Sequence, residues 1–179
     1  MKQRLTTMNS LNSTRNHTMK KTAFALALVV ASAFSTQALA SGSHAGGHDK
    51  VSVGEPGDSK KATQTIRVTM KETDDGKMIF TPATIKVRQG QTVHFAIKNA
   101  GELAHEFVLD DKATIQEHKI TMEKFPDMEH DDPNAIRLEP GKSGDIYWTF
   151  TNDGTFEFAC LVPGHYDAGM HGPLDVVKK

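Results

Sequence analysis

Three side chains that can bind soft metals follow one another at equal spacing near the end of this 179-residue chain. Cys160, His165 and Met170 are separated by four residues each. The Pro-Gly pair at 163–164 would end a preceding strand, and the Ala-Gly pair at 168–169 gives the second half of the segment room to bend. We therefore predict a loop that places a thiolate, an imidazole and a thioether around one centre.

A further donor must come from elsewhere in the chain, and His105 fits. It stands at the start of a predicted strand, after a Gly-containing turn, so its side chain can enter at the same end of a sandwich. A trigonal set of two histidines and one cysteine with a weak axial methionine is the type 1 copper site used for electron transfer. Sulfur favours Cu(I) and imidazole suits Cu(II), so a geometry between their preferences lets the ion change valence with little rearrangement. We predict one copper ion held by His105, Cys160, His165 and Met170.

The amino-terminal residues predict export. Residues 19–21 (Met-Lys-Lys) precede an apolar stretch at 22–34 and an Ala-Leu-Ala sequence ending at Ala40, which are the three parts of a secretory signal peptide. We expect Met19 to be the working start, residues 1–40 to be removed near Ala40, and the mature protein to lie in the periplasm. The apolar stretch is shorter than the roughly 20 residues of a membrane-spanning helix, and no other segment approaches that length.

Charge narrows the range of partners. Residues 1–40 hold five of the 21 basic residues and no acidic residue, so the remaining chain has 16 basic and 22 acidic residues and a formal charge of −6. Nucleic acid and anionic membrane surfaces would repel such a chain. Its 139 residues suit one domain with one core.

The single cysteine has two alternative interpretations. Exported proteins usually use cysteines in pairs as disulfides, but Cys160 has no second cysteine in the chain. It could be an inert buried thiol, or a nucleophile activated by His165. The interpretation as a nucleophile is weaker, because the sequence has no Asn or Asp at a position that would support a Cys-His pair. It also leaves Met170 without a role. The equal spacing across a Pro-Gly turn favours the metal site.

Composition divides the mature chain into two parts. Residues 41–63 are rich in Gly, Ser, Lys and Asp and have few apolar residues, so we predict a disordered arm. His44 and His48 in this arm could capture copper loosely. From residue 64 to residue 179, short segments of alternating apolar and polar residues are separated by turn signals every ten residues or so, which is typical of an all-β sandwich.

One stretch departs from the strand pattern. We predict a helix-containing insertion near 111–135, with Ile115, Met122 and Phe125 on one helical side and an end at Pro126. Its residues include candidates for a second, softer copper site, namely Met122, Met128, His130 and, from outside the stretch, His171. The alternative is that Met122 packs the helix onto the sandwich, while Met128 and His130 lie on a solvated acidic loop.

Residues 78–179 resemble the cupredoxin family, the plastocyanin/azurin type of blue copper proteins. The pattern F-x-P-x-x-I-x-V-x-x-G-x-x-V at 80–93 resembles the opening hairpin of that family. Cys160, His165 and Met170 match its ligand loop, and Ala-His-Glu-Phe at 104–107 matches its first ligand strand. The resemblance implies a Greek-key β-sandwich of about eight strands with copper near one end. It also implies that His165 presents its ring edge to solvent and passes the electron.

Two features differ from much of the cupredoxin family. A small amide residue often follows the first ligand histidine, whereas Glu106 stands there in this chain. The insertion and the histidine-bearing arm resemble the periplasmic cupredoxins of bacterial copper-resistance systems, some of which have green rather than blue sites.

We therefore expect a periplasmic type 1 copper-binding protein, capable of one-electron transfer, that serves in copper handling and tolerance. The alternative is a dedicated soluble electron carrier between respiratory partners. An enzyme such as a multicopper oxidase or a nitrite reductase is disfavoured, because the sequence offers neither a second domain nor His-x-His pairs. We expect a monomer whose partner is either a redox protein or a copper-handling protein.

Overall fold

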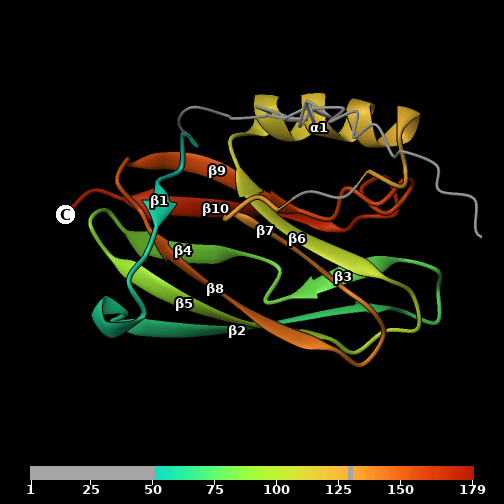
Figure 1. Ribbon diagram of the computed structural model, residues 1–179, viewed down its shortest axis with the longest axis horizontal. Coiled ribbons are helices and arrows are strands. Elements are labelled where there is room, and N and C mark those ends of the chain that lie inside the picture. The colour runs from blue at the N-terminus through green and yellow to red at the C-terminus, as the bar shows by residue number, and fades with distance from the viewer. Residues whose placement is uncertain (1–50, 129–130) are drawn as a thin grey trace, which may run out of the picture. The chain divides into compact units, whose positions relative to one another are not determined.

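The computed structural model describes residues 51–128 and 131–179, drawn in colour in Figure 1. The predicted signal peptide, His44, His48 and His130 lie outside these residues. The described residues form ten strands, one α-helix and one short 3₁₀ helix: β1 (Glu55–Pro56), η1 (Ser59–Lys61), β2 (Gln64–Glu72), β3 (Met78–Thr81), β4 (Ile85–Arg88), β5 (Thr92–Asn99), β6 (His105–Asp110), α1 (Lys112–Lys124), β7 (Ala135–Leu138), β8 (Ser143–Thr149), β9 (Gly154–Ala159) and β10 (His171–Val177). None of the described helices is long and apolar enough to cross a membrane.

The strands form two five-stranded sheets. One sheet has the order β1-β8-β5-β2-β3, and the other has the order β4-β10-β9-β6-β7. Most neighbours are antiparallel, while β2 with β5 and β4 with β10 are parallel pairs. The predicted all-β sandwich with a helical insertion is confirmed, although it has ten strands rather than about eight.

The core between the sheets is formed by the apolar residues that alternate with polar residues along the strands. In β2, Val68 and Met70 are buried while their neighbours face outward, as a period of two requires. Trp148 and four phenylalanines, at 95, 107, 150 and 158, are also fully buried in this core. Phe107 from β6 lies 5.7 Å from Phe80 and 5.8 Å from Phe158 between ring centroids, so aromatic packing holds the strand that begins with His105.

The helix covers the outer face of the second sheet. Figure 1 shows α1 lying along β9 and β6, where Ile115 and Met122 pack against Val108 and Ala159. As a result, all six residues of β6 are buried, on both faces of the sheet. The predicted helix is confirmed at 112–124, but the placement of Phe125 on its buried side is wrong. Phe125 follows the last helical residue and is 60% exposed, because the backbone leaves helical geometry there.

Part of the segment that was predicted to be a disordered arm contacts the sandwich. Within residues 51–63, Val53 is fully buried, and β1 pairs with the end of β8. The Ser52 hydroxyl donates a hydrogen bond to Asp111, the N-cap residue of α1, at 2.8 Å. Low apolar content predicts disorder only on average, and here Val51 and Val53 supply the core contacts that the composition does not predict.

Candidate metal centre

The elements bring His105 and Cys160 to the same end of the second sheet. His105 is the first residue of β6, and Cys160 directly follows the last residue of β9. These strands are antiparallel neighbours, so the start of one lies beside the end of the other. His165 and Met170 lie in the connection from β9 to β10, which is the loop predicted from the sequence.

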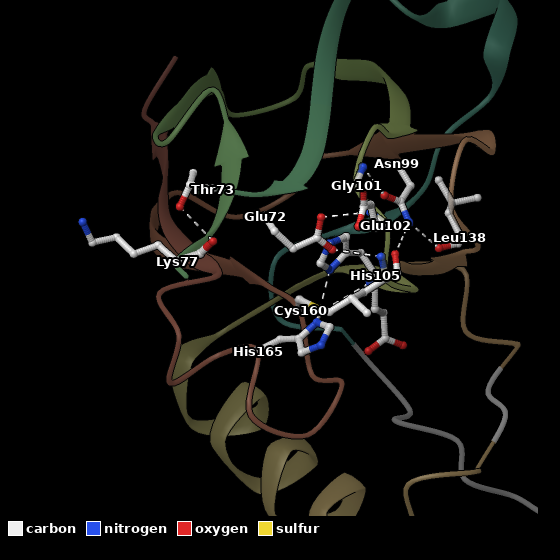
Figure 2. Close-up of polar contacts among 12 residues, drawn as sticks. Glu72, Thr73, Lys77, Asn99, Gly101, Glu102, His105, Leu138, Cys160 and His165 are labelled. Carbon is white, nitrogen blue, oxygen red and sulfur yellow. Dashed lines mark hydrogen bonds and ion pairs between the residues drawn. The ribbon is translucent and has the colours of Figure 1, made fainter. Parts of the chain in front are cut away.

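Three of the four predicted ligands converge on one point. Ligand atoms of His105, Cys160 and His165 all lie within 4.8 Å of one another, and all three residues are buried. The Nδ1 atoms of the two histidines are 3.1 Å apart, and Cys160 Sγ lies 3.4 Å from Nδ1 of His165. Figure 2 shows His165 and Cys160 together on one side of His105.

Backbone hydrogen bonds fix the shape of the loop at 160–170. The His165 N–H donates to the Val162 carbonyl, and the Met170 N–H donates to the His165 carbonyl, both at 3.0 Å. Gly164 and Gly169 have φ values of +84° and +99°, a backbone conformation that residues other than glycine rarely adopt. The bends expected from the Pro-Gly and Ala-Gly pairs are therefore present at both positions.

Met170 closes the loop beside Cys160. The Cys160 N–H donates to the Met170 carbonyl at 3.0 Å, so the two residues lie opposite each other where β9 and β10 meet the loop. The Met170 side chain is fully buried and belongs to the same apolar cluster as Cys160. The structure thus places Met170 next to the three converging residues.

Glu72 holds the far side of the His105 ring. Its Oε1 lies 2.9 Å from Nε2 of His105, and its carboxylate also accepts the backbone N–H groups of Glu102 and Leu103 at 2.9 Å (Figure 2). Burial alone would raise the pKa of Glu72. The backbone hydrogen bonds and the His105 ring lower it by more than burial raises it, so the net pKa is about 2. The ionised carboxylate can only accept, so Nε2 of His105 carries the proton and its Nδ1 lone pair faces Cys160 and His165.

Burial sets the protonation of the three converging groups. It raises the pKa of the Cys160 thiol to about 12, against opposing hydrogen bonds from the backbone of Glu106 and Val162. Burial lowers the pKa of His105, and burial together with the His105 charge lowers the pKa of His165 to about 4. At neutral pH the metal-free site therefore holds two neutral imidazoles and one thiol. A metal ion would have to displace a single proton, that of Cys160.

Glu106 connects the site to the outer face of β6. Its backbone N–H donates to Cys160 Sγ at 3.3 Å, which is the kind of contact that tunes a metal-bound sulfur. Its side chain points the opposite way from His105, as neighbours on a strand do. There the carboxyl group receives the backbone N–H of Leu161, and burial raises its pKa to about 7. Glu106 thus bonds to the segment that carries the ligand loop.

His165 is the ligand candidate nearest to solvent, with 7% of its surface exposed. Pro163 beside it is exposed, and Val162 is half-buried. Tyr166 turns its hydroxyl to Glu157 instead, at 3.1 Å. A small apolar rim from the ligand loop therefore borders the His165 ring.

The remaining sequence candidates separate into different places. His171 stacks on Tyr166 with ring centroids 4.2 Å apart, and its Nδ1 lies 3.3 Å from Glu157. Met122 and Met128 lie instead on the helix side of β6, where Met128 packs against the cluster that contains Met122. The structure does not bring His171 together with these methionines.

Two residues that position His105 were missed by the sequence analysis. Glu72 ends β2, and no spacing connects it to a histidine 33 residues later. Asn99, fully buried, binds the turn before His105: its Nδ2 donates to the carbonyls of Leu103 at 2.7 Å and Leu138 at 2.9 Å, and its Oδ1 accepts from the Gly101 N–H. A polar residue at the end of an apolar strand and before a glycine turn is a signal that could have identified Asn99.

The donor set fits copper. Two neutral imidazoles and a thiol converge with the correct nitrogen atoms facing inward, and a buried thioether stands beside them. The arrangement is consistent with a type 1 copper site, in which two histidines and a cysteine form a trigonal set with a weak axial methionine.

Comparisons with known proteins agree with this geometry. The sequence profile described as "Copper binding proteins, plastocyanin/azurin family" matches residues 66–177. The chain is 47% identical over 158 residues to "Copper-resistant cuproprotein CopI" of Rubrivivax gelatinosus, covering 83% of this chain and 93% of that protein. It is 38% identical over 152 residues to a protein of the same description from Pseudomonas aeruginosa, covering 69% of this chain and 81% of that one. The solved structure of dithionite-reduced auracyanin from Roseiflexus castenholzii superposes with a TM-score of 0.55 at 26% identity, covering 65% of this chain and 98% of that one.

Proposed function

This chain belongs to the plastocyanin/azurin family of copper-binding proteins, and from that premise we propose that it is a periplasmic type 1 copper protein that serves in copper handling and tolerance. His105, Cys160 and His165 would hold the ion, and Met170 would supply a fourth, weaker donor. Residues 1–40 are the signal peptide that exports it. It acts as a monomer, and it is not an enzyme.

The observation that carries this proposal is the convergence of His105, Cys160 and His165 in one buried site. Glu72 and the loop hydrogen bonds hold these donors in place. When bound, copper supplies a one-electron couple between Cu(I) and Cu(II). The protein contributes the fixed donors, the exclusion of water and the apolar rim at His165.

Copper tolerance is favoured by the relatives. Two proteins described as copper-resistant cuproproteins align over 83% and 69% of this chain. The complete donor set and the likeness to auracyanin favour the second candidate, a dedicated soluble electron carrier between respiratory partners. Both candidates use the same site.

The proposed site is tested by adding Cu(II) to the purified chain that begins at residue 41 and recording its visible and electron paramagnetic resonance spectra. We expect an intense thiolate-to-copper absorption band that is absent from Cys160→Ser. A colourless wild-type protein would refute the type 1 assignment. Met170→Leu tests the axial role, and it should retain the band with a shifted maximum.

The cellular role is tested by deleting the gene. Growth that fails only in excess copper supports the tolerance role, and complementation with Cys160→Ser should not restore it. Normal growth in excess copper together with a respiratory defect would favour the electron carrier instead.

A further inference from the structure

A pocket of ≈ 420 Å³ lies on the side of β6 opposite the three converging residues, between the end of α1 and β7. It is lined by the candidate donors Glu106, Met122 and Met128, by the charged residues Asp131, Arg137 and Glu139, and by the apolar residues Ala135 and Ile136. We propose that this pocket, called here the Glu106 pocket, binds a second, monovalent soft metal ion, Cu(I), through Glu106, Met122 and Met128. The choice of Cu(I) as the ion rests on the proposed copper-handling function. The presence of the pocket and of its donor atoms does not depend on that function.

The first support is an unsatisfied carboxylate oxygen. Glu106 is 4% exposed, and among the described residues its Oε2 is one of two buried side-chain polar atoms without a hydrogen-bond partner. Burying such an atom is costly unless something occupies the space in front of it. Arg137 is the register partner of Glu106 on β7 and is exposed, and its charge acts on this carboxyl group by lowering its pKa. The carboxylate therefore has an open bonding position inside the pocket.

The second support is the pair of thioethers. Met122 is 2% exposed and belongs to the cluster under the helix, and Met128 packs against that cluster from the following turn. Thioether sulfur is a soft ligand that selects Cu(I) over the harder divalent ions. Two thioethers and one carboxylate neutralise the charge of a monovalent ion and suit its low coordination numbers. His171 does not line the pocket, and His130, which the sequence also suggested, lies outside the described residues.

The third support is the charge of the pocket. Three acidic residues, Glu106, Asp131 and Glu139, and one basic residue, Arg137, line it, so its field favours a cation over an anion. Its position adds a functional reason. The Glu106 backbone N–H bonds Cys160 Sγ at 3.3 Å, so an ion held by the Glu106 side chain would lie across one strand from the proposed type 1 site.

The test uses the mature chain with Cys160→Ser, labelled with ¹³C at the methionine methyl groups, and Ag(I) as a redox-silent soft probe. The mature chain has five methionines, at 70, 78, 122, 128 and 170, whose methyl signals are assigned by single Met→Leu variants. We expect one equivalent of Ag(I) to shift the signals of Met122 and Met128 and to leave the fully buried Met70 unchanged. Signals at 122 and 128 that stay fixed, or a shift confined to Met170, would overturn the proposal.

Glu106→Gln tests the carboxylate. It keeps the shape of the side chain and an oxygen for the Leu161 N–H, and we expect the affinity for Ag(I) and Cu(I) to fall at least tenfold. The matched control is Glu139→Gln on the exposed edge of the pocket, which should change affinity less than twofold. Equal effects of the two variants would overturn the assignment of Glu106 as a ligand. Thermal unfolding of each variant checks that the fold is retained.

This test is independent of the main proposal. Because it is read in Cys160→Ser, it can succeed when the wild-type protein forms no coloured Cu(II) site, and it can fail when that site forms normally. Ag(I) bound by histidines of the 41–50 segment leaves the methionine methyl signals unchanged, so it does not imitate the expected result.

Discussion

The carboxylate of Glu72 accepts a hydrogen bond from Nε2 of His105 across 2.9 Å, and this contact joins the two sheets at the metal centre. Glu72 ends β2 in one sheet, and His105 begins β6 in the other. The carboxylate is itself fixed by the N–H groups of Glu102 and Leu103. It therefore sets both the tautomer and the direction of the His105 ring.

Replacing Glu72 by Gln should weaken the metal centre without unfolding the protein. The amide oxygen can still accept from Nε2, but the negative charge that makes the imidazole a stronger donor is lost. We expect the Cu(II) affinity to fall about 10- to 100-fold. The reduction potential should rise, because Cu(II) gains more from a strong donor than Cu(I) does. Competition titration and spectroelectrochemistry measure the two quantities. Glu102→Gln is the control, since Glu102 contributes a backbone N–H alone; equal results for both variants would contradict the role of Glu72.

Copper binding should release about one proton per ion at pH 7, and that proton should come from Cys160. Its thiol has a pKa of about 12 in the metal-free protein, whereas both histidines are already neutral. Linkage then predicts that Cu(II) affinity rises about tenfold per pH unit between about pH 7 and pH 9. Calorimetry in buffers of different ionisation enthalpy counts the protons. The difference between wild type and Cys160→Ser isolates the contribution of the thiol, and a difference of zero would mean that the thiol does not bind as a thiolate.

Asn99→Ala should cost about 1–3 kcal/mol of unfolding free energy, because it leaves buried backbone groups of the turn before His105 without partners. The same change should lower copper affinity, since that turn delivers His105 to the site. Asn152→Ala is the matched control. Asn152 is exposed and makes one hydrogen bond, to the Ser52 carbonyl, so its loss should stay within about 0.5 kcal/mol. Urea unfolding compares the two, and similar losses would refute the role given to Asn99.

Asp111→Ala should lower the unfolding free energy by about 1 kcal/mol at pH 7, because Asp111 caps α1 by accepting the N–H groups of Ala113 and Thr114. Burial raises the pKa of Asp111, but hydrogen bonds from Thr114 and Ser52 lower it more, and the net shift is downward. A depressed folded-state pKa gives stability that is complete above the unfolded value of about 3.9 and is lost as the pH falls through the lower folded value. Urea unfolding at pH 7 and pH 3 should therefore show a smaller effect at pH 3. An effect that grows in acid would contradict the capping contact.

The sequence predicted the ligand loop well because its evidence is local. Cys160, His165 and Met170 share one connection, and the turns between them need residues that are recognisable by type. His105 was predictable because a strand start and a preceding glycine turn define its place. The sandwich followed from apolar alternation, which depends on neighbouring residues alone.

What the sequence did not predict depends on contacts between distant segments. Glu72 reaches His105 because the two sheets pack against each other at one end. The two residues are 33 positions apart in the sequence, so no local sequence pattern could predict their contact. Val53 is buried by β8 and the core, although the residues next to it in the sequence are of the types found in disordered segments. Phe125 was placed on the helix by periodicity, but the helix ends one residue earlier and the ring remains exposed.

The burial of β6 on both faces means that the four proposed ligands are held in two different ways. His105 stands on a strand with no solvent-facing residue, and it is held by Glu72 from the opposite sheet. Cys160, His165 and Met170 belong to a single connection at the surface, whose bends depend on two glycines. A substitution that distorts this connection should therefore disturb three of the proposed copper ligands at once, while the His105 side stays in place. Copper binding should accordingly respond to substitutions at Gly164 and Gly169 far more than to changes in the packing of β6.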